Sequence, residues 1–133
     1  MTKDGNEKKR LLGIDYGSKR VGVALSDEEG RMAFPKAVFQ NDRYLFTEIK
    51  SLCEANDIKA IVMGESKNFN MEENPIMKQI LAFKSELERD LQLPVYLEPE
   101  FMTSLEAQHL QGKTVFNDAS AAALILKSFI EKH

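Results

Sequence analysis

A short stretch near the start of the chain combines an acid, a glycine and two basic residues. Asp15 ends an apolar run, Gly17 follows two residues later, and Lys19 and Arg20 precede a second apolar run. A carboxylate is a hard ligand for divalent cations, a glycine lets the backbone approach a phosphate, and Lys and Arg bind phosphate oxygens. Asp-x-Gly is also common turn chemistry in a β-hairpin with a polar tip. Taken alone, the pattern therefore leaves a phosphate or metal site and a plain hairpin equally open.

Asp118 is a second candidate, at the start of the last predicted helix. An acid at this position is favoured by capping and by the helix dipole without any metal. However, residues 118, 122, 125 and 129 fall on one helical face, so Asp118 shares the apolar stripe that must pack against a sheet. An acid on such a stripe needs a partner. Its position therefore keeps a functional role open for Asp118, and the family resemblance described below supplies most of the argument for that role.

Three further acids follow predicted strands. Glu98 and Glu100 come at the end of the last one, and Glu65 comes soon after an apolar run at residues 60–63. Each can be a metal ligand, since oxygen donors suit Mg²⁺ and Mn²⁺. Each can also be a solvated loop acid. For Glu100 the two interpretations are equally strong, whereas for Glu65 the solvated loop acid is the stronger one. With only two histidines in the chain, a zinc site rich in histidine is not expected.

Hydrophobic patterning predicts five strands and four helices in the order βββαβαβαα. The predicted strands cover residues 11–15, 21–25, 31–40, 60–63 and 94–97, and the predicted helices cover 42–56, 75–91, a short segment from Thr103 or Ser104, and 118–130. Asn41 or Asp42 is the expected N-cap of the first helix. Pro35 inside the third strand indicates a bulge or an edge position.

This order predicts an α/β fold. Three strands joined by short turns form an antiparallel meander, and strands that alternate with helices pair in parallel. The result is a mixed five-stranded sheet flanked by helices. Ligands of such sheets bind beyond the carboxyl ends of the parallel strands. If the first, fourth and fifth strands are parallel, Asp15, the loop from Gly64 and the acids Glu98 and Glu100 converge there.

Composition places the chain among folded proteins of one domain. It has 133 residues, 43% of them hydrophobic and 29% charged. Residues 1–10 are a polar tail without the apolar stretch of a secretory signal, and residues 11–133 are expected to form a single domain. The longest apolar run, Ala121 to Leu126, is far too short to span a membrane. The single cysteine, Cys53, is expected to be buried and fits a cytoplasmic protein.

The charge balance bears on nucleic acid as a partner. There are 18 Lys and Arg against 21 Asp and Glu, a net charge of -3. Without the tail, which holds four basic and two acidic residues, 14 and 19 remain, a net charge of -5. Affinity for a polyphosphate comes mainly from Lys and Arg, so this balance predicts weak and salt-sensitive binding. Divalent ions bound to the acids would reverse their sign locally, so nucleic acid stays a possible partner.

Several segments together resemble the YqgF/RuvX family, the Holliday-junction-resolvase-like proteins also described as pre-16S rRNA nucleases. The resemblance covers nearly everything from Leu11 to the end of the chain. It is carried by GIDYGSKRVGVALSD at 13–27, AFP at 33–35, IVMG with Asn68, FMTSLEA at 101–107 and NDASAAALIL at 117–126. It implies an RNase H-like fold and a metal-dependent nuclease acting on structured nucleic acid, either the 5′ end of pre-16S rRNA in ribosome biogenesis or Holliday-junction-like DNA.

The resemblance also assigns residues. It implies that Asp15, Glu100 and Asp118 are catalytic and hold Mg²⁺ or Mn²⁺, with Glu98 as an alternative to Glu100. The substrate-binding candidates are Lys19, Arg20, Asn68 and Thr103. The expected state is a monomer or a homodimer.

Three departures from the family pattern support a different class of function. The family's Asp-Glu-Arg is Pro99-Glu100-Phe101 here, the segment before Asp118 is short and carries one lysine, and Glu65 adds an acid near the site. Each weakens a nuclease interpretation. The alternative is a noncatalytic RNase H-like module that binds nucleic acid or a protein in ribosome assembly. Asp-x-Gly hairpins also occur in actin-like kinases, but those enzymes need two domains around the nucleotide.

Overall fold

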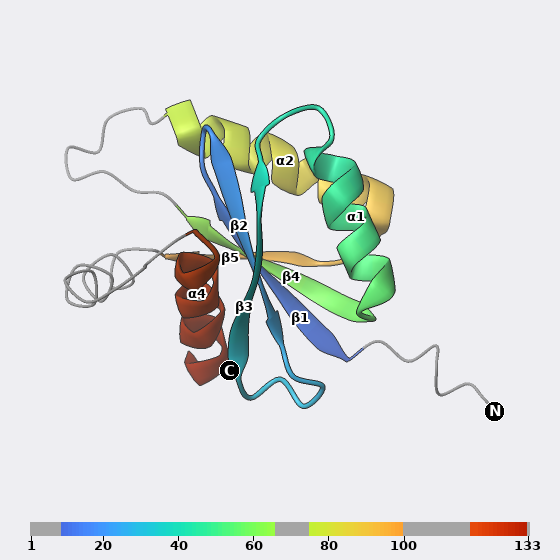
Figure 1. Cartoon of the computed structure of the whole chain (residues 1–133), viewed down its shortest axis with the longest axis vertical. Coiled ribbons are helices and arrows are strands. Elements are labelled where there is room, and N and C mark those ends of the chain that lie inside the picture. Colours follow the sequence, from blue (N-terminus) through green and yellow to red (C-terminus); the bar gives the residue numbers. More distant parts are fainter. Residues whose placement is uncertain (1–8, 66–74, 100–117, 133) are drawn as a thin grey trace.

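Five strands form one sheet in the order β3-β2-β1-β4-β5 (Figure 1). The computed structural model describes residues 9–65, 75–99 and 118–132. The strands are β1 (Arg10–Tyr16), β2 (Arg20–Ser26), β3 (Ala33–Gln40), β4 (Ile58–Glu65) and β5 (Val95–Pro99). The helices are α1 (Leu45–Ala55), α2 (Pro75–Leu91) and α4 (Asp118–Lys132). The sequence-predicted helix near Thr103 lies outside the described residues, as does most of the tail.

The pairing of the strands confirms the predicted mixed sheet. β1 pairs antiparallel with β2, and β2 pairs antiparallel with β3. β4 lies parallel to β1, and β5 lies parallel to β4. The carboxyl ends of β1, β4 and β5 therefore meet at one edge, where β2 begins and β3 ends.

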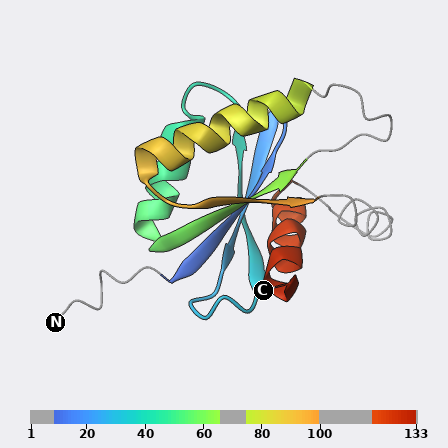
Figure 2. The ribbon, with the colours of Figure 1, turned by 180° about the vertical axis from the view of Figure 1, so that it is seen from behind.

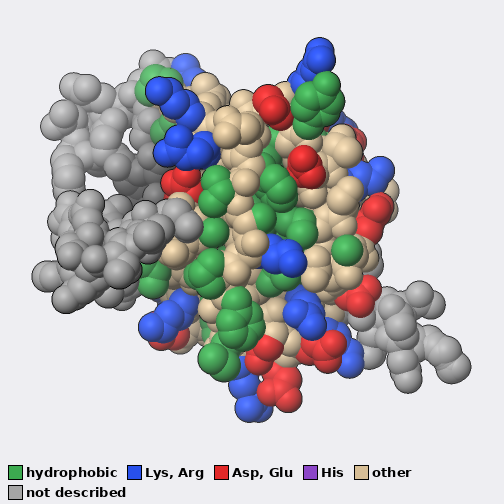
Figure 3. Space-filling model, in the orientation of Figure 1, with side chains coloured by type: hydrophobic (Ala, Val, Ile, Leu, Met, Phe, Trp, Pro, Cys, Tyr) green, Lys and Arg blue, Asp and Glu red, His purple; other side chains and the backbone are tan. Residues whose placement is uncertain are grey.

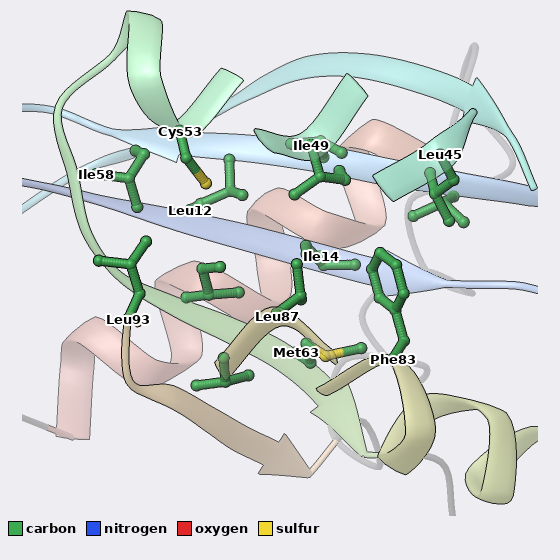
Figure 4. Packing of buried hydrophobic residues seen from close by; sticks show 14 of the residues in the cluster. Leu12, Ile14, Leu45, Ile49, Cys53, Ile58, Met63, Phe83, Leu87 and Leu93 are labelled. Carbon is green, nitrogen blue, oxygen red and sulfur yellow. The ribbon is translucent and has the colours of Figure 1, made fainter. Parts of the chain in front are cut away.

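Helices cover both faces of the sheet. Figure 2 shows α1 and α2 together on one face and α4 on the other. The larger core lies under α1 and α2, where Ile49, Cys53 and Leu87 pack against apolar side chains of β1 and β4 (Figure 4). A smaller core lies under α4, where Ala122, Ile125 and Leu126 contact the sheet. Burial of Cys53 confirms its predicted place in the core.

Strand alternation decides which residues of β1 face α4. Leu12 and Ile14 are fully buried in the core under α1 and α2. Leu11 belongs to the core under α4, and a Cβ at Gly13 would meet Ala122 O and Leu126 Cβ, each at 2.9 Å. Because side chains alternate along a strand, Asp15 is directed to the α4 face as well.

The third strand is an edge strand with a bulge, as Pro35 predicts. The register between β2 and β3 shifts where Val23 pairs with Ala37 and Ala24 pairs with Pro35. Lys36 is the extra residue. A proline has no N–H to donate, so the edge is where the sheet tolerates it best.

Some predicted boundaries were wrong. β4 continues through Gly64 and Glu65, which the polar composition had placed in a loop, and β5 includes Glu98. Parallel pairing of Gly64 with Glu98 extends both strands beyond their apolar runs. The first helix begins at Leu45 after an N-cap at Tyr44 whose side chain makes no capping hydrogen bond, so the N-cap lies later in the sequence than Asn41 or Asp42. Asp42 instead accepts a hydrogen bond from Tyr44 N at 2.9 Å in the turn that precedes the helix.

In the described parts of the chain, no helix is both long and apolar enough to cross a membrane.

Candidate active site

The hairpin between β1 and β2 carries the basic residues of the first motif. Its connection is only three residues long, and a Cβ on Gly17 would lie 2.6 Å from the main-chain oxygen of Arg20. The turn therefore requires glycine there. Lys19 and Arg20 are exposed at its end. The turn reaches the edge of the sheet formed by the carboxyl ends of the parallel strands.

Asp15 and Asp118 come together at this edge, although 102 residues separate them in the sequence. Asp15 pairs with Gly22 across β1 and β2. A Cβ on Gly22 would collide with the main-chain carbonyl of Asp118 and lie 2.7 Å from Ala119 N. The first residues of α4 therefore rest directly on Gly22. Because directly paired residues point to the same face, Asp15 projects toward the start of α4.

Arg20 binds the carboxylate of Asp118. Its Nε lies 3.0 Å from Asp118 Oδ2, within hydrogen-bond distance. The side chain of Asp118 is 34% exposed and that of Arg20 is 57% exposed, so the pair opens to solvent and is stabilised only modestly. Figure 3 shows Lys and Arg side chains near an acidic side chain at the upper left, where β1 meets β2 and α4 begins. Two acids and two cations thus share one end of the sheet.

Glu98 sits on the same face but farther across the sheet. It is only 3% exposed. Its carboxylate accepts a hydrogen bond from Ser128 Oγ at 2.7 Å and pairs with Lys132 Nζ at 2.8 Å. Ser128 lies ten residues along α4 from Asp118, about 15 Å along the axis. Glu98 is therefore held by the second half of α4, away from Asp118.

Glu65 is directed to the other face. Met63 belongs to the core under α1 and α2, and Gly64 pairs with Glu98 on the α4 face. Alternation then turns Glu65 toward the side of α2, opposite to Asp15.

The remaining candidates, Glu100, Asn68 and Thr103, lie outside the described residues. Among the residues that are described, no group of three or more His, Cys, Asp or Glu side chains is placed to hold a metal. Asp15, which pairs with Gly22, and Asp118, whose main chain rests on Gly22, are of the donor type that suits a magnesium or manganese site. Mg²⁺ is commonly held by one or two carboxylates together with substrate phosphates.

Sequence reasoning missed the partners of Gly17 at the site and of Glu98 farther across the sheet. Asn41 was expected to cap a helix, but its side chain donates to Gly17 O. Ser128 and Lys132 were not among the sequence-predicted site residues, and Lys132 lies beyond the predicted end of the last helix, but both bind Glu98. Their spacing of four on a helix places them on one face, which is the only sequence signal that points to them.

Comparison with known proteins assigns this arrangement to a family. The model of the RuvX family, described as Holliday junction resolvase, matches residues 9–132. The chain belongs to the RuvX family. A curated relative from Nitratidesulfovibrio vulgaris (strain DP4) is 36% identical over 132 residues, 91% of this chain and 92% of that protein. A relative from Lactobacillus acidophilus is 34% identical over 139 residues, which cover 93% of this chain and 97% of that protein. Both carry the name "Putative pre-16S rRNA nuclease".

Solved structures agree with this fold. The RuvC of T. thermophilus, solved in complex with a Holliday junction substrate, superposes with a TM-score of 0.64 at 14% identity. The alignment covers 93% of this chain and 94% of RuvC. The fowlpox virus resolvase in complex with Holliday junction DNA gives a TM-score of 0.55 at 12% identity, covering 92% and 97%. The RuvX chain therefore has the RNase H-like fold of the RuvC-like resolvases.

Proposed function

We propose that this RuvX chain is a cytoplasmic, divalent-metal-dependent nuclease that hydrolyses phosphodiester bonds of structured nucleic acid. The 5′ end of precursor 16S rRNA is the substrate that we favour. The observation that carries the proposal is the meeting of Asp15 and Asp118 across Gly22, beside Lys19 and Arg20. We favour RNA over DNA as the substrate because the curated relatives are named as pre-16S rRNA nucleases.

The acids of the site suit a hard cation. Asp15 and Asp118 are the residues that would hold Mg²⁺ or Mn²⁺, and the family resemblance adds Glu100. When bound, such an ion orients the reacting groups and stabilises negative charge that develops at the phosphate. The main chain of Asp118 rests on Gly22, and Arg20 binds its carboxylate. Two residues of β2 therefore position both the main chain and the carboxylate of Asp118.

The cations of the site suit the substrate backbone. Lys19 is exposed on the turn, next to Arg20, and Lys and Arg side chains there can contact phosphate oxygens. Arg20 also neutralises Asp118 and thereby lowers the repulsion between this acid and a phosphate. The overall charge of -3 does not attract a polyphosphate to the rest of the surface. We therefore propose that binding of nucleic acid depends on these local cations and on divalent ions.

Asp15→Asn tests the proposal. Labelled RNA spanning the 5′ boundary of 16S rRNA and a four-way DNA junction are incubated with wild type or variant in Mn²⁺, Mg²⁺ or EDTA. We expect the substitution to lower cleavage at least about 100-fold, because it removes a charged ligand worth several kcal/mol to the transition state. Asp90→Asn, which removes one exposed acid of α2, is the matched control and leaves cleavage unchanged.

Two outcomes contradict the proposal. Equal cleavage by wild type and Asp15→Asn would assign the activity to a contaminant. Binding of RNA without cleavage, together with no heat on titration of Mn²⁺ into the protein, would favour the noncatalytic module instead. Comparison of the RNA and the DNA junction under the same conditions decides the class of substrate.

A further inference from the structure

Asn41 lies immediately after β3 and contacts the turn between β1 and β2 with both its main chain and its side chain. Its main-chain N–H donates to Lys19 O at 2.9 Å. Its side-chain Nδ2 donates to Gly17 O at 2.7 Å. Asn41 is half-buried, and one of the two residues that it holds, Lys19, is an exposed cation of the site. The residue that follows β3 thus binds both the first and the last residue of the turn.

The position of these contacts gives them a specific effect. The main-chain bond to Lys19 extends the ladder between β2 and β3 by one step beyond the pair Arg20 and Gln40. The side-chain bond to Gly17 then sets where the turn leaves β1. Ser18 and Lys19 are exposed. A short turn has few backbone angles to adjust. Hydrogen bonds to its first and last residues therefore fix the position of the Cα atom of Lys19 and the direction in which its side chain leaves the backbone.

We propose that Asn41 is a positioning residue that holds the turn so that Lys19 is presented to a phosphate of the substrate. The inference rests on the proposed function, since it assumes that the site receives nucleic acid. Asn41 acts through the turn and does not itself touch the reacting groups. It therefore contributes to affinity for nucleic acid and leaves the chemical step largely intact.

The structure provides a matched control in Asn56. Its side-chain Nδ2 donates to Leu52 O at 2.9 Å at the end of α1, and Asn56 is half-buried like Asn41. Asn56→Ala thus removes the same kind of hydrogen bond far from the turn. Asn41→Asp is a second variant of nearly identical shape, which replaces the donor toward Gly17 O with an acceptor.

The first experiment measures cleavage kinetics and binding of the same labelled RNA. For Asn41→Ala we expect KM and Kd to rise ~3- to 10-fold, the range that one hydrogen bond supports, with kcat within about twofold of wild type. Asn41→Asp should bind the RNA at least as weakly as Asn41→Ala, and Asn56→Ala should have the KM and Kd of wild type. Thermal unfolding of Asn41→Ala and Asn56→Ala shows whether both variants are equally folded. A fall of kcat without a change of KM or Kd for Asn41→Ala would overturn the inference.

The second experiment asks whether Asn41 acts through Lys19. Lys19→Gln weakens binding and reduces the dependence of binding on salt by about one phosphate contact. If Asn41 positions Lys19, adding Asn41→Ala to Lys19→Gln weakens binding little further. Independent effects that multiply in the double variant would overturn the inference. Absence of cleavage by a wild type that binds RNA would overturn only the proposed catalysis, because the double-variant test uses Kd.

Discussion

Gly22→Ala is the substitution that most directly tests how α4 and the sheet build the site. The added Cβ would collide with the main-chain carbonyl of Asp118 and lie 2.7 Å from Ala119 N. Both neighbours are backbone atoms of a helix terminus, which cannot rotate away as a side chain can. The start of α4 must therefore move away from β2, and Asp118 moves with it, away from Asp15.

The size of the effect follows from these contacts. Ala119 N must move from 2.7 Å to the 3.4 Å at which ordinary contact begins, a displacement of about 0.7 Å, and the closer carbonyl of Asp118 must move farther. Overpacking of this kind costs about 1–3 kcal/mol of folding free energy. Misplacement of a reacting group by about 1 Å can cost about 100-fold in rate. We therefore expect a moderately destabilised protein with at most a few per cent of wild-type cleavage.

Gly13→Ala is the matched control. Its Cβ would meet Ala122 O and Leu126 Cβ, both at 2.9 Å, under the middle of the same helix. We expect a loss of stability in urea unfolding that is smaller than that of Gly22→Ala, because the overpacking is of the same kind but its closest contacts, at 2.9 Å, are less severe. Cleavage should fall only a few-fold, since Asp118 lies about 6 Å along the helix axis from Ala122.

The comparison of the two variants can refute the reasoning. Wild-type cleavage by Gly22→Ala under conditions where it is folded would show that the contact between β2 and Asp118 does not set the site. Equal losses of cleavage in Gly22→Ala and Gly13→Ala would show that only the stability of α4 matters. Both measurements use the Mn²⁺ assay described for Asp15→Asn.

Two further predictions concern stability. Lys132→Met leaves the buried carboxylate of Glu98 without its cation and should lower the free energy of unfolding in urea by about 1–2 kcal/mol. The control Lys127→Met removes a lysine from an exposed pair and should change this free energy by less than about 0.5 kcal/mol. Equal losses in the two variants would contradict the stabilising role of the pair between Lys132 and Glu98. Hydrogen bonding, chiefly from the main-chain N–H of Arg31, lowers the pKa of Asp27 from its ordinary 3.8. The stability this gives is present above that value and is lost as pH falls through the lowered pKa, so Asp27→Asn should flatten the fall in Tm at low pH; an unchanged curve would contradict it.

The sequence was sufficient for the parts of the fold that local chemistry dictates. Apolar alternation and helical spacing predicted the five strands and the helices α1, α2 and α4 within a few residues, because burial of one face imposes a period on each element. Pro35 predicted the bulged edge strand. The motif around Asp15, Gly17, Lys19 and Arg20 predicted a tight hairpin with an acid before it.

The ends of elements and the partners of polar groups depended on long-range pairing. Gly64, Glu65 and Glu98 have the composition of a loop, but parallel pairing between β4 and β5 makes them strand residues. Asn41 is of a residue type that often caps helices, but its position after β3 lets its side chain donate a hydrogen bond to Gly17 O. Hydrogen bonds between residues far apart in sequence leave no local signal.

The sequence by itself determined that this chain has an Asp at the end of its first strand, two cations in the following turn and an Asp at the start of its last helix. Only the tertiary structure decided how these residues meet. α4 lies over β2, and Gly22 has no side chain to keep the helix away, so the main chain of Asp118 rests on the residue that pairs with Asp15, and its carboxylate reaches Arg20. Glu98 carries the same charge but is held by Ser128 and Lys132 instead. The physical reason is that residue type fixes what a group can bind, whereas packing between distant segments fixes what it reaches.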